Sequence, residues 1–337
     1  MNIKKLAKKL GLSITTVSRG LGGYSDVSEN TRERIIRFAN KYNYSPNPNA
    51  SNLASRKTNT LGFVIPLYGL NSNRLNQASF FEFISGMSEK INSEKIQFLM
   101  TFANTIAEEK EAYKRLIDVQ KVDKIILHNL KKNDSRIKLL QDNNINFVGW
   151  GRTQGKINYP WVDLDNEGSV DLIMHYLFEK NHRKIAFINV NEKYNFAFQR
   201  KQGYIKFLKQ KKIKINKNYY VTVDGEDPEL NSAEIKKLIE KNSKLTAIIC
   251  SSEYSAAGAI KALNELNLKI GKDISLITFD GSVVNSISSP SITAVTHDRK
   301  QLGQKAIELL TAKKRSKINN YLAKPKIIER GSVHKVI

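Results

Sequence analysis

From residue 60 onward the sequence alternates between short, unbroken apolar runs and longer amphipathic stretches with helical spacing. This alternation predicts parallel sheets that are covered by helices on both faces. About ten strands of this kind exceed one comfortable sheet, so we expect two doubly wound subdomains, with a break near residues 157–161. The predicted strands cover residues 60–66, 96–102, 122–128, 145–151, 184–190, 219–225, 245–251 and 274–280.

The first 21 residues predict two short helices joined by a tight turn. Leu6 and Leu10 give the first helix an apolar stripe, Gly11 can end it in a left-handed conformation, and Ser13 can cap the second helix. A helix-turn-helix has this pattern, and its second helix presents side chains to the major groove of DNA. The alternative is an ordinary surface hairpin. We prefer the DNA-binding interpretation because the turn, the cap, the small Ala7 and the basic charge agree.

A third helix is expected after Ser28, which is placed as its N-cap. Ile35, Ile36 and Ala39 are predicted to face inward, and the helix should end before Pro46 because a residue that precedes proline avoids the helical region. Three helices then form a small bundle, and its core should also contain Val27, Phe38 and Tyr42.

Residues 47–57 are short, polar and rich in helix-capping residues. Asn47 followed by Pro48 is a good helix start, and about two turns could form. Two turns alone are unstable in water, so we expect this segment to order only on DNA with a second copy of the chain. A plain flexible linker is the alternative.

The charge of the chain suits a polyanionic partner, because 55 Lys and Arg against 32 Asp and Glu give a net charge of +23. Residues 1–57 contribute 11 − 3 = +8, and the remaining residues contribute 44 − 29 = +15. We attribute the excess positive charge after residue 57 to a Lys-, Asn- and Ile-rich composition of the whole proteome more than to another nucleic-acid-binding surface.

Several features of other protein classes are missing from the sequence. The single cysteine, Cys250, lies in an apolar run and predicts a buried small hydrophobe without any disulfide. No signal peptide and no 18-residue apolar stretch occurs, so we expect a cytoplasmic protein without membrane contact. The five histidines are dispersed, and there is no phosphate loop or nucleophile elbow. We therefore expect no enzyme, no metal and no cofactor.

The stretches GLSITTVSRGLGG, VSENTRERI and YNYSPNPNASNLA together resemble the LacI/GalR family of bacterial transcriptional repressors. The resemblance implies that Ile14, Thr15 and Arg19 read bases, the arginine by gripping a guanine edge, while Thr16 and Ser18 contact phosphates. It also implies that the hinge leucine enters the minor groove between base steps. The implied DNA-contacting residues are Ser13, Ile14, Thr15, Thr16, Ser18 and Arg19 in the head, and Asn47, Ala50 and Leu53 in the hinge.

The same resemblance implies a core similar to periplasmic sugar-binding proteins, with a ligand in the cleft between two subdomains. Arg200 and Asp280 match the family's cleft arginine and aspartate, which could serve sugar hydroxyls or form a structural ion pair. Trp150 could stack on a sugar ring or belong to the core, and we interpret Asp165 as a helix cap. The expected ligand-binding residues are Phe80, Trp150, Arg152, Arg200, Ser252 and Asp280.

The expected fold class is therefore α/β: a three-helix helix-turn-helix domain (1–46), a hinge helix (47–57), and a ligand-binding core (58–337) made of two doubly wound parallel-sheet subdomains. The resemblance assigns about 58–158 and 289–318 to the N-subdomain, and about 159–288 and 319–337 to the C-subdomain. Tetramers in the family that the chain resembles use a C-terminal heptad tail, whereas this chain ends in the strand-like ERGSVHKVI, so the resemblance implies a homodimer.

The predicted function is a ligand-responsive regulator that binds a pseudo-palindromic operator in double-stranded DNA. We expect a repressor of carbohydrate genes that a sugar inducer releases. Two alternatives stay open: a co-repressor-dependent regulator that senses a non-sugar metabolite, and a constitutive DNA-binding protein whose core only dimerises.

Overall fold

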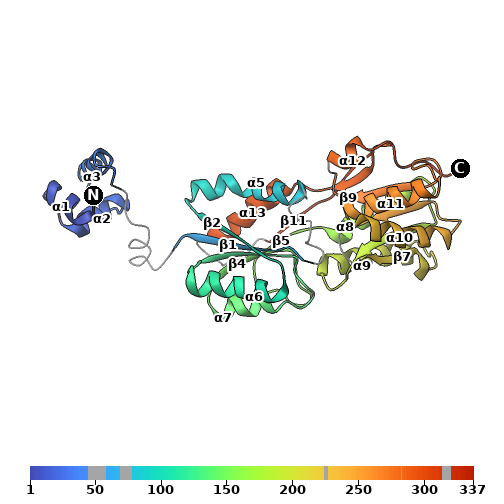
Figure 1. Ribbon diagram of the computed structural model, residues 1–337, viewed down its shortest axis with the longest axis horizontal. Coiled ribbons are helices and arrows are strands. Elements are labelled where there is room, and N and C mark those ends of the chain that lie inside the picture. The colour runs from blue at the N-terminus through green and yellow to red at the C-terminus, as the bar shows by residue number, and fades with distance from the viewer. Residues whose placement is uncertain (45–57, 69–77, 224–226, 282, 313–319) are drawn as a thin grey trace. The chain divides into compact units, whose positions relative to one another are not determined.

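The computed structural model describes residues 1–44, 58–68, 78–223, 227–281, 283–312 and 320–337 (Figure 1). The chain divides into two compact units, Met1–Thr58 and Asn59–Ile337, which we describe separately. None of the helices in the described residues has both the length and the hydropathy of a membrane-spanning segment.

The N-terminal unit contains the three predicted helices, α1 (Ile3–Leu10), α2 (Ile14–Leu21) and α3 (Glu29–Lys41). Their shared core consists of Leu6, Ala7, Leu10, Val17, Val27, Ile35 and Ala39. Gly11 ends α1 with a φ of 66°, as its freedom from a Cβ allows.

The prediction that Ile36 faces the core of this bundle is wrong, because its side chain is 42% exposed. Ile35 and Ala39 are four residues apart and share one face of α3, whereas Ile36 is rotated by about 100° from Ile35. Phe38 packs only partly against the core. Tyr42 is the C-cap of α3, and its ring is tilted by 44° against that of Phe38, with centroids 5.9 Å apart.

The larger unit contains two six-stranded sheets. The first has the strand order β11-β5-β4-β3-β1-β2 and the second β12-β10-β9-β8-β6-β7. Every pairing is parallel except that of β12 with β10, which is antiparallel. The first sheet uses β1 (Thr60–Pro66), β2 (Gln97–Ala103), β3 (Lys124–His128), β4 (Asn146–Trp150), β5 (Trp161–Leu164) and β11 (Tyr321–Ala323). The second uses β6 (Ile185–Val190), β7 (Tyr220–Val223), β8 (Ala247–Cys250), β9 (Ser275–Phe279), β10 (Thr293–Thr296) and β12 (Lys326–Ile328).

Helices cover both faces of each sheet, as the doubly wound prediction requires (Figure 1). One face of the first sheet packs against α5 (Ala78–Ser93) and α13 (Arg299–Thr311), and the other against α6 (Ile106–Lys114), the π-helical turn Arg115–Val119 and α7 (Ser135–Asp142). The second sheet lies between α8 (Asn166–Glu179) with α9 (Asn195–Gln210) and α10 (Pro228–Glu240) with α11 (Glu253–Glu265). The short α12 (Val283–Ile287) follows β9. Cys250 is buried in β8, as expected.

The chain passes from one sheet to the other three times. Each passage comes later in the sequence than the expected subdomain boundaries at residues 158, 288 and 318. β5 pairs with β4, β10 with β9, and β11 with β5, so the chain crosses only after each of these strands. The turn at Tyr159-Pro160 precedes β5 and does not end the subdomain. These strands have three or four residues, too few to show a clear apolar pattern in the sequence.

The expected strand-like character of the C-terminal segment is also not found, since residues 329–337 form no strand. This segment is held by single hydrogen bonds instead. The backbone N–H of His334 donates to Ser275 Oγ at 3.0 Å, and that of Val336 donates to the carbonyl of Lys180 at 2.9 Å.

Candidate functional site

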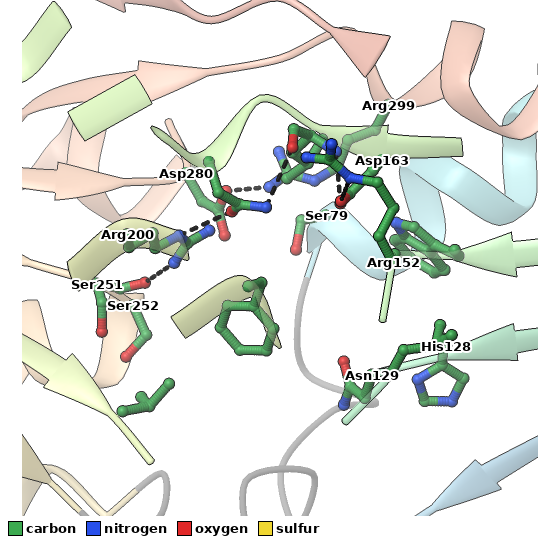
Figure 2. Close-up of a pocket in the computed structure, with 17 residues that line it drawn as sticks. Ser79, His128, Asn129, Arg152, Asp163, Arg200, Ser251, Ser252, Asp280 and Arg299 are labelled. Atoms are coloured by element: carbon green, nitrogen blue, oxygen red, sulfur yellow. Dashed lines mark hydrogen bonds and ion pairs between the residues drawn. The ribbon is translucent and has the colours of Figure 1, made fainter. Parts of the chain in front are cut away.

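A cleft of about 150 Å³ lies where the carboxyl ends of strands from both sheets face each other (Figure 2). Its first wall follows β3, β4 and β5, and its second wall follows β6, β8 and β9 together with the first turns of α9. Of the six ligand-binding residues predicted, five line this cleft: Trp150, Arg152, Arg200, Ser252 and Asp280. Further polar lining residues were not predicted, among them Asp163, Asn166 and Arg299.

Arg200 projects from α9 and is 6% exposed. Its Nε donates to Asn166 Oδ1 at 3.0 Å and its Nη1 to the carbonyl of Ser251 at 2.9 Å, while Nη2 has no hydrogen-bond partner among the described residues. The guanidinium also lies 3.8 Å from the centroid of the Phe279 ring. Burial lowers the pKa of Arg200 to about 10, so the side chain stays protonated at neutral pH. The residue thus presents a fixed donor to the cleft.

Asp280 follows β9 in a left-handed conformation with a φ of 70°. It forms an ion pair with Arg299 at the start of α13, and this pair uses Oδ1 only. Burial alone would raise the pKa of Asp280, but the charges of Arg299 and Arg200 outweigh that effect and lower it. The carboxylate is therefore ionised, and Oδ2 has no hydrogen-bond partner in the described chain.

Arg152, beyond the end of β4, forms a second ion pair across the first sheet. Its Nε donates to Asp163 Oδ2 at 2.8 Å, and its guanidinium lies 4.7 Å from the centroid of the Trp161 ring. Burial raises the pKa of Asp163 despite the nearby Arg152. Three arginines and two aspartates line the cleft, and the two ion pairs leave Arg200 as the cation without a carboxylate partner among the described residues.

Trp150 satisfies both interpretations that the sequence allowed. It lines the cleft, and it stacks on Phe83 with ring centroids 3.7 Å apart and an interplanar angle of 12°. Phe80 does not line the cleft. It is fully buried in the core beside Phe63, because it faces the sheet from α5, and the neighbouring Ser79 reaches the cleft instead.

Two residues near the cleft act as helix caps. Ser252 caps α11 in a capping box, in which its Oγ accepts from the backbone N–H of Ser255 at 3.1 Å. Asp165 caps α8, as predicted, by accepting from the N–H of Gly168 at 2.9 Å. The following Asn166 lines the cleft and accepts a hydrogen bond from Arg200.

The missed residues had no distinctive signal in the sequence. Asp163 lies inside a four-residue strand, and Arg299 is 19 positions away from the aspartate that it holds. Only the family pattern of Asp165-Asn166 offered a clue to Asn166. Contacts of this range are decided by the packing of whole elements.

In the N-terminal unit, the predicted DNA-contacting side chains lie at the start and on the outer face of α2. Ser13 caps the helix, with its Oγ accepting from the N–H of Thr16 at 3.0 Å, and Ile14 is 43% exposed. Thr15 and Ser18 are also exposed. The buried Val17 anchors the opposite face.

Arg19 is the predicted base-reading residue with the most contacts. Its Nε forms an ion pair with Asp26 at 2.8 Å, and the guanidinium lies 5.0 Å from the centroid of the Tyr24 ring. Both members of the ion pair are about half exposed, so the carboxylate can orient the arginine without burying it. The predicted hinge contacts Asn47, Ala50 and Leu53 lie outside the described residues.

Known families match both units of the chain. Residues 2–47 match the family described as bacterial regulatory proteins, lacI family, and residues 174–333 match the periplasmic binding protein-like domain. The HTH-type transcriptional regulator AglR of Rhizobium meliloti (strain 1021) is 33% identical over 282 residues, which cover 83% of this chain and 78% of the relative. RafR of Escherichia coli, also an HTH-type transcriptional regulator, is 29% identical over 307 residues, 90% of this chain and 88% of the relative.

Solved structures with the same fold include the lac repressor dimer bound to operator and the anti-inducer ONPF, with a TM-score of 0.82 at 20% identity over 99% of each chain. The transcriptional regulator CelR in complex with cellobiose has a TM-score of 0.74 at 21% identity, over 98% of this chain and 99% of that one. The chain therefore belongs to the LacI family of bacterial regulatory proteins and is a DNA-binding transcriptional regulator, not an enzyme.

Proposed function

We propose that this regulator is a repressor of carbohydrate uptake or catabolism genes and that a sugar in the cleft releases it from its operator. The observation that carries this proposal is the cleft itself, where the buried donor of Arg200 and the ionised acceptor of Asp280 line one space. A sugar hydroxyl can accept from a guanidinium and donate to a carboxylate at the same time. Trp150 adds an apolar surface of the kind that packs against a sugar ring.

Similar proteins support a sugar as the effector. CelR was solved with cellobiose. Another structure of the same fold is a sugar-binding transcriptional regulator from Escherichia coli, with a TM-score of 0.71 at 20% identity. These likenesses favour a carbohydrate over other small molecules, without indicating which one.

The DNA contacts proposed for the head are those of α2. Arg19 would read a guanine edge, Ile14 and Thr15 would contact base edges, and Thr16 and Ser18 would bind phosphates. Leu53 of the hinge would enter the minor groove. Effector binding would favour an arrangement of the core in which the hinges of two protomers separate, which is a population shift between two states. Because its proposed partner is chromosomal DNA, we expect the protein to act in the cytoplasm.

A homodimer is part of the proposal, because one small head makes few contacts with DNA and a two-fold dimer fits a pseudo-palindromic operator. The edge strand β2 supports it. Met100 and Phe102 are 36% and 47% exposed and lie on the same face of this strand as Phe98. Such an apolar surface on an open sheet edge favours association with a second copy.

A second candidate is a repressor that needs its ligand in order to bind DNA. The excess cation in the cleft would suit a ligand rich in acceptors. A constitutive DNA-binding protein is disfavoured, since it would have no use for a cleft lined with buried charges.

The test is binding of the full-length protein to its own upstream DNA at fixed salt, titrated with a panel of mono- and disaccharides. Salt is held constant because phosphate contacts make the affinity strongly salt-dependent. Release by one sugar supports the proposal. Specific binding that no sugar alters removes the carbohydrate claim, and binding only in the presence of a ligand supports the co-repressor alternative.

A further inference from the structure

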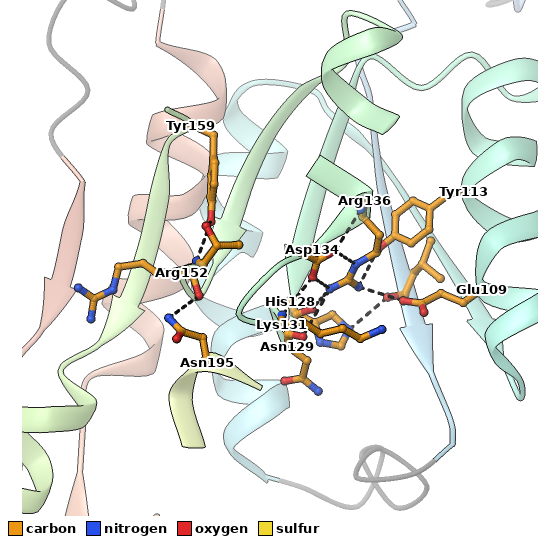
Figure 3. A network of polar contacts seen from close by, with 12 residues as sticks. Glu109, Tyr113, His128, Asn129, Lys131, Asp134, Arg136, Arg152, Tyr159 and Asn195 are labelled. Atoms are coloured by element: carbon orange, nitrogen blue, oxygen red, sulfur yellow. Dashed lines mark hydrogen bonds and ion pairs between the residues drawn. The ribbon is translucent and has the colours of Figure 1, made fainter. Parts of the chain in front are cut away.

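Two loops of the first subdomain hold a short segment of the second beside the cleft (Figure 3). We call this contact the junction and define it by residues 129–134, 151–155 and 193–195. The N–H of Lys132 donates to the carbonyl of Lys193 at 3.1 Å, and the N–H of Asn195 donates to the carbonyl of Leu130 at 3.0 Å. Lys131 and Tyr194 form an antiparallel bridge between these bonds.

One side chain adds to this backbone contact. Asn195 Nδ2 donates to the carbonyl of Arg152 at 2.9 Å, and Asn195 is 3% exposed. The two loops are also bound to each other, because the N–H of Gln154 donates to the carbonyl of Lys132 at 3.0 Å. The junction therefore joins three segments from two sheets.

A buried guanidinium supports the junction from the first subdomain. Arg136 bonds Asp134 through Nε at 2.9 Å and through Nη2 at 2.7 Å, and its Nη1 donates to Glu109 at 2.9 Å. Its Nη2 also donates to the carbonyl of His128 at 3.0 Å. Asp134 in turn accepts from the N–H of Lys131 at 3.1 Å. The side chain of Arg136 is 13% exposed, so water competes little with these bonds.

Each junction segment continues directly into a wall of the cleft. Asn129 and Arg152 line the cleft from the first subdomain, and Asn195 begins α9, which carries Arg200. The spacing of Arg152 and Arg200 across the cleft thus depends on the junction.

We propose that Asn195 and Arg136 are positioning residues, which fix the distance between the two walls of the cleft before an effector arrives. Asn195 ties the start of α9 to the loop after β4, and Arg136 holds the loop after β3 in the shape that receives residues 193–195. Neither side chain lines the cleft. That the cleft receives an effector rests on the proposed function, whereas the junction itself does not.

The first test is hydrogen–deuterium exchange on the full-length protein without any sugar. Asn195→Asp replaces a donating amide by a carboxylate that repels the carbonyl of Arg152, and Asn195→Ala removes the bond without repulsion. We expect faster exchange at residues 151–155 and 193–199 in both variants, and unchanged exchange in β6. Unchanged exchange at 151–155 in the folded Asn195→Ala protein would overturn the proposal.

Asn189→Ala is the matched control. Asn189 is fully buried, and its Nδ2 donates to the carbonyl of Ala197 and to the hydroxyl of Tyr220, both at 2.8 Å and both within the second subdomain. The Oδ1 atoms of Asn189 and Asn195 both lack a hydrogen-bond partner in the described residues. Asn189→Ala should loosen the start of α9 without any effect on exchange at residues 151–155.

The second test uses the sugar that the operator assay identifies. Losing one hydrogen bond of this kind costs about 3- to 10-fold in binding, so Asn195→Ala should raise the sugar concentration for half-release by that factor. The affinity for DNA without sugar should not change. Arg136→Lys should keep part of the response that Arg136→Met loses. An equal shift in Asn189→Ala would overturn the positioning role, whereas a failure of every sugar would overturn the proposed function and leave the exchange test decisive.

Discussion

Arg200 and Asp280 are both charged and both line the cleft, but Arg200 is bonded to neutral groups and Asp280 to a charged one. Arg200 bonds only neutral acceptors, Asn166 and the carbonyl of Ser251. Asp280 is paired with Arg299, so removing its carboxylate would leave a buried arginine without its partner. Substitution of Arg200 is therefore the cleaner test of the effector site.

Arg200→Gln should leave operator binding intact and abolish release by the inducing sugar. The substitution costs about 1–3 kcal/mol of stability, because Asn166 Oδ1 loses its donor. Operator titrations with and without sugar check this, with the exposed Arg183→Gln as control. Wild-type release by Arg200→Gln would show that the cleft is not the effector site.

Two buried histidines should make the protein less stable in mild acid. Burial lowers the pKa of His297 to about 3 and that of His182 to about 4, from 6.5. The unfolded chain takes up these protons below about pH 6.5 and the folded chain does not, so stability falls as the pH decreases. Each histidine contributes a slope of about 1.4 kcal/mol per pH unit at most.

Urea unfolding at pH 7.0, 6.0 and 5.0 measures this slope. The range stays above the acid region in which Asp134 and Asp280, whose pKa values are lowered, would also take up protons. His297→Gln should have a shallower dependence than the wild type. An identical slope in both proteins would contradict the assignment.

At the scale of elements, two features can be tested by substitution: the N-caps of α2 and α3, and the contact between α5 and α13. Ser13 and Ser28 are both N-caps, with their Oγ atoms 3.0 and 3.4 Å from the backbone nitrogens of Thr16 and Thr31. Only the first cap belongs to the helix that we expect in the major groove.

Ser13→Ala and Ser28→Ala should each cost about 1 kcal/mol of stability in the head. Ser13→Ala should in addition weaken operator binding, because it loosens the first turn of α2, while Ser28→Ala should bind nearly as the wild type does. Thermal unfolding and operator titration compare the pair. Equal losses of DNA affinity would mean that α2 has no special role.

The contact between α5 and α13 requires glycine on each helix. A Cβ on Gly86 would collide with the carbonyl oxygen of Lys300, and one on Gly303 with that of Phe83. Because backbone atoms cannot move aside as side chains do, Gly86→Ala should cost about 1–3 kcal/mol. Chemical denaturation measures this cost, with the exposed Ser85→Ala of the same helix as control. A wild-type midpoint would show that the helices can separate freely.

At the scale of the whole molecule, the proposed function depends on a second copy of the chain. Phe102→Glu would place a charge at an exposed position of the edge strand β2 and should convert a dimer into a monomer with little loss of fold stability. Operator affinity should then fall by more than tenfold. Analytical ultracentrifugation measures the mass, and Ile215→Glu, on the second subdomain, is the control. A dimeric Phe102→Glu protein would place the interface elsewhere.

Local chemistry explains why so much of the fold was predictable from the sequence. Gly11, Ser13 and Ser28 mark helix ends by their own conformations and hydrogen bonds. The long apolar strands are buried on both faces and show it as continuous runs, as in β1 and β6. The resemblance to the family then indicated Arg200 and Asp280 as residues of one cleft, and the structure brings them there.

The tertiary structure alone decided what these residues contact. The partners of Asp280 and Arg152, the burial of Phe80 and the junction at Asn195 all join segments that are separate in the sequence. The short strands β5, β10 and β11 likewise join their sheets by pairing with neighbouring strands, and their own residues do not indicate which sheet they join. The sequence shows which segments can form a helix or a strand and which side chains carry a charge. A contact between residues that are distant in the sequence exists only once whole elements have packed.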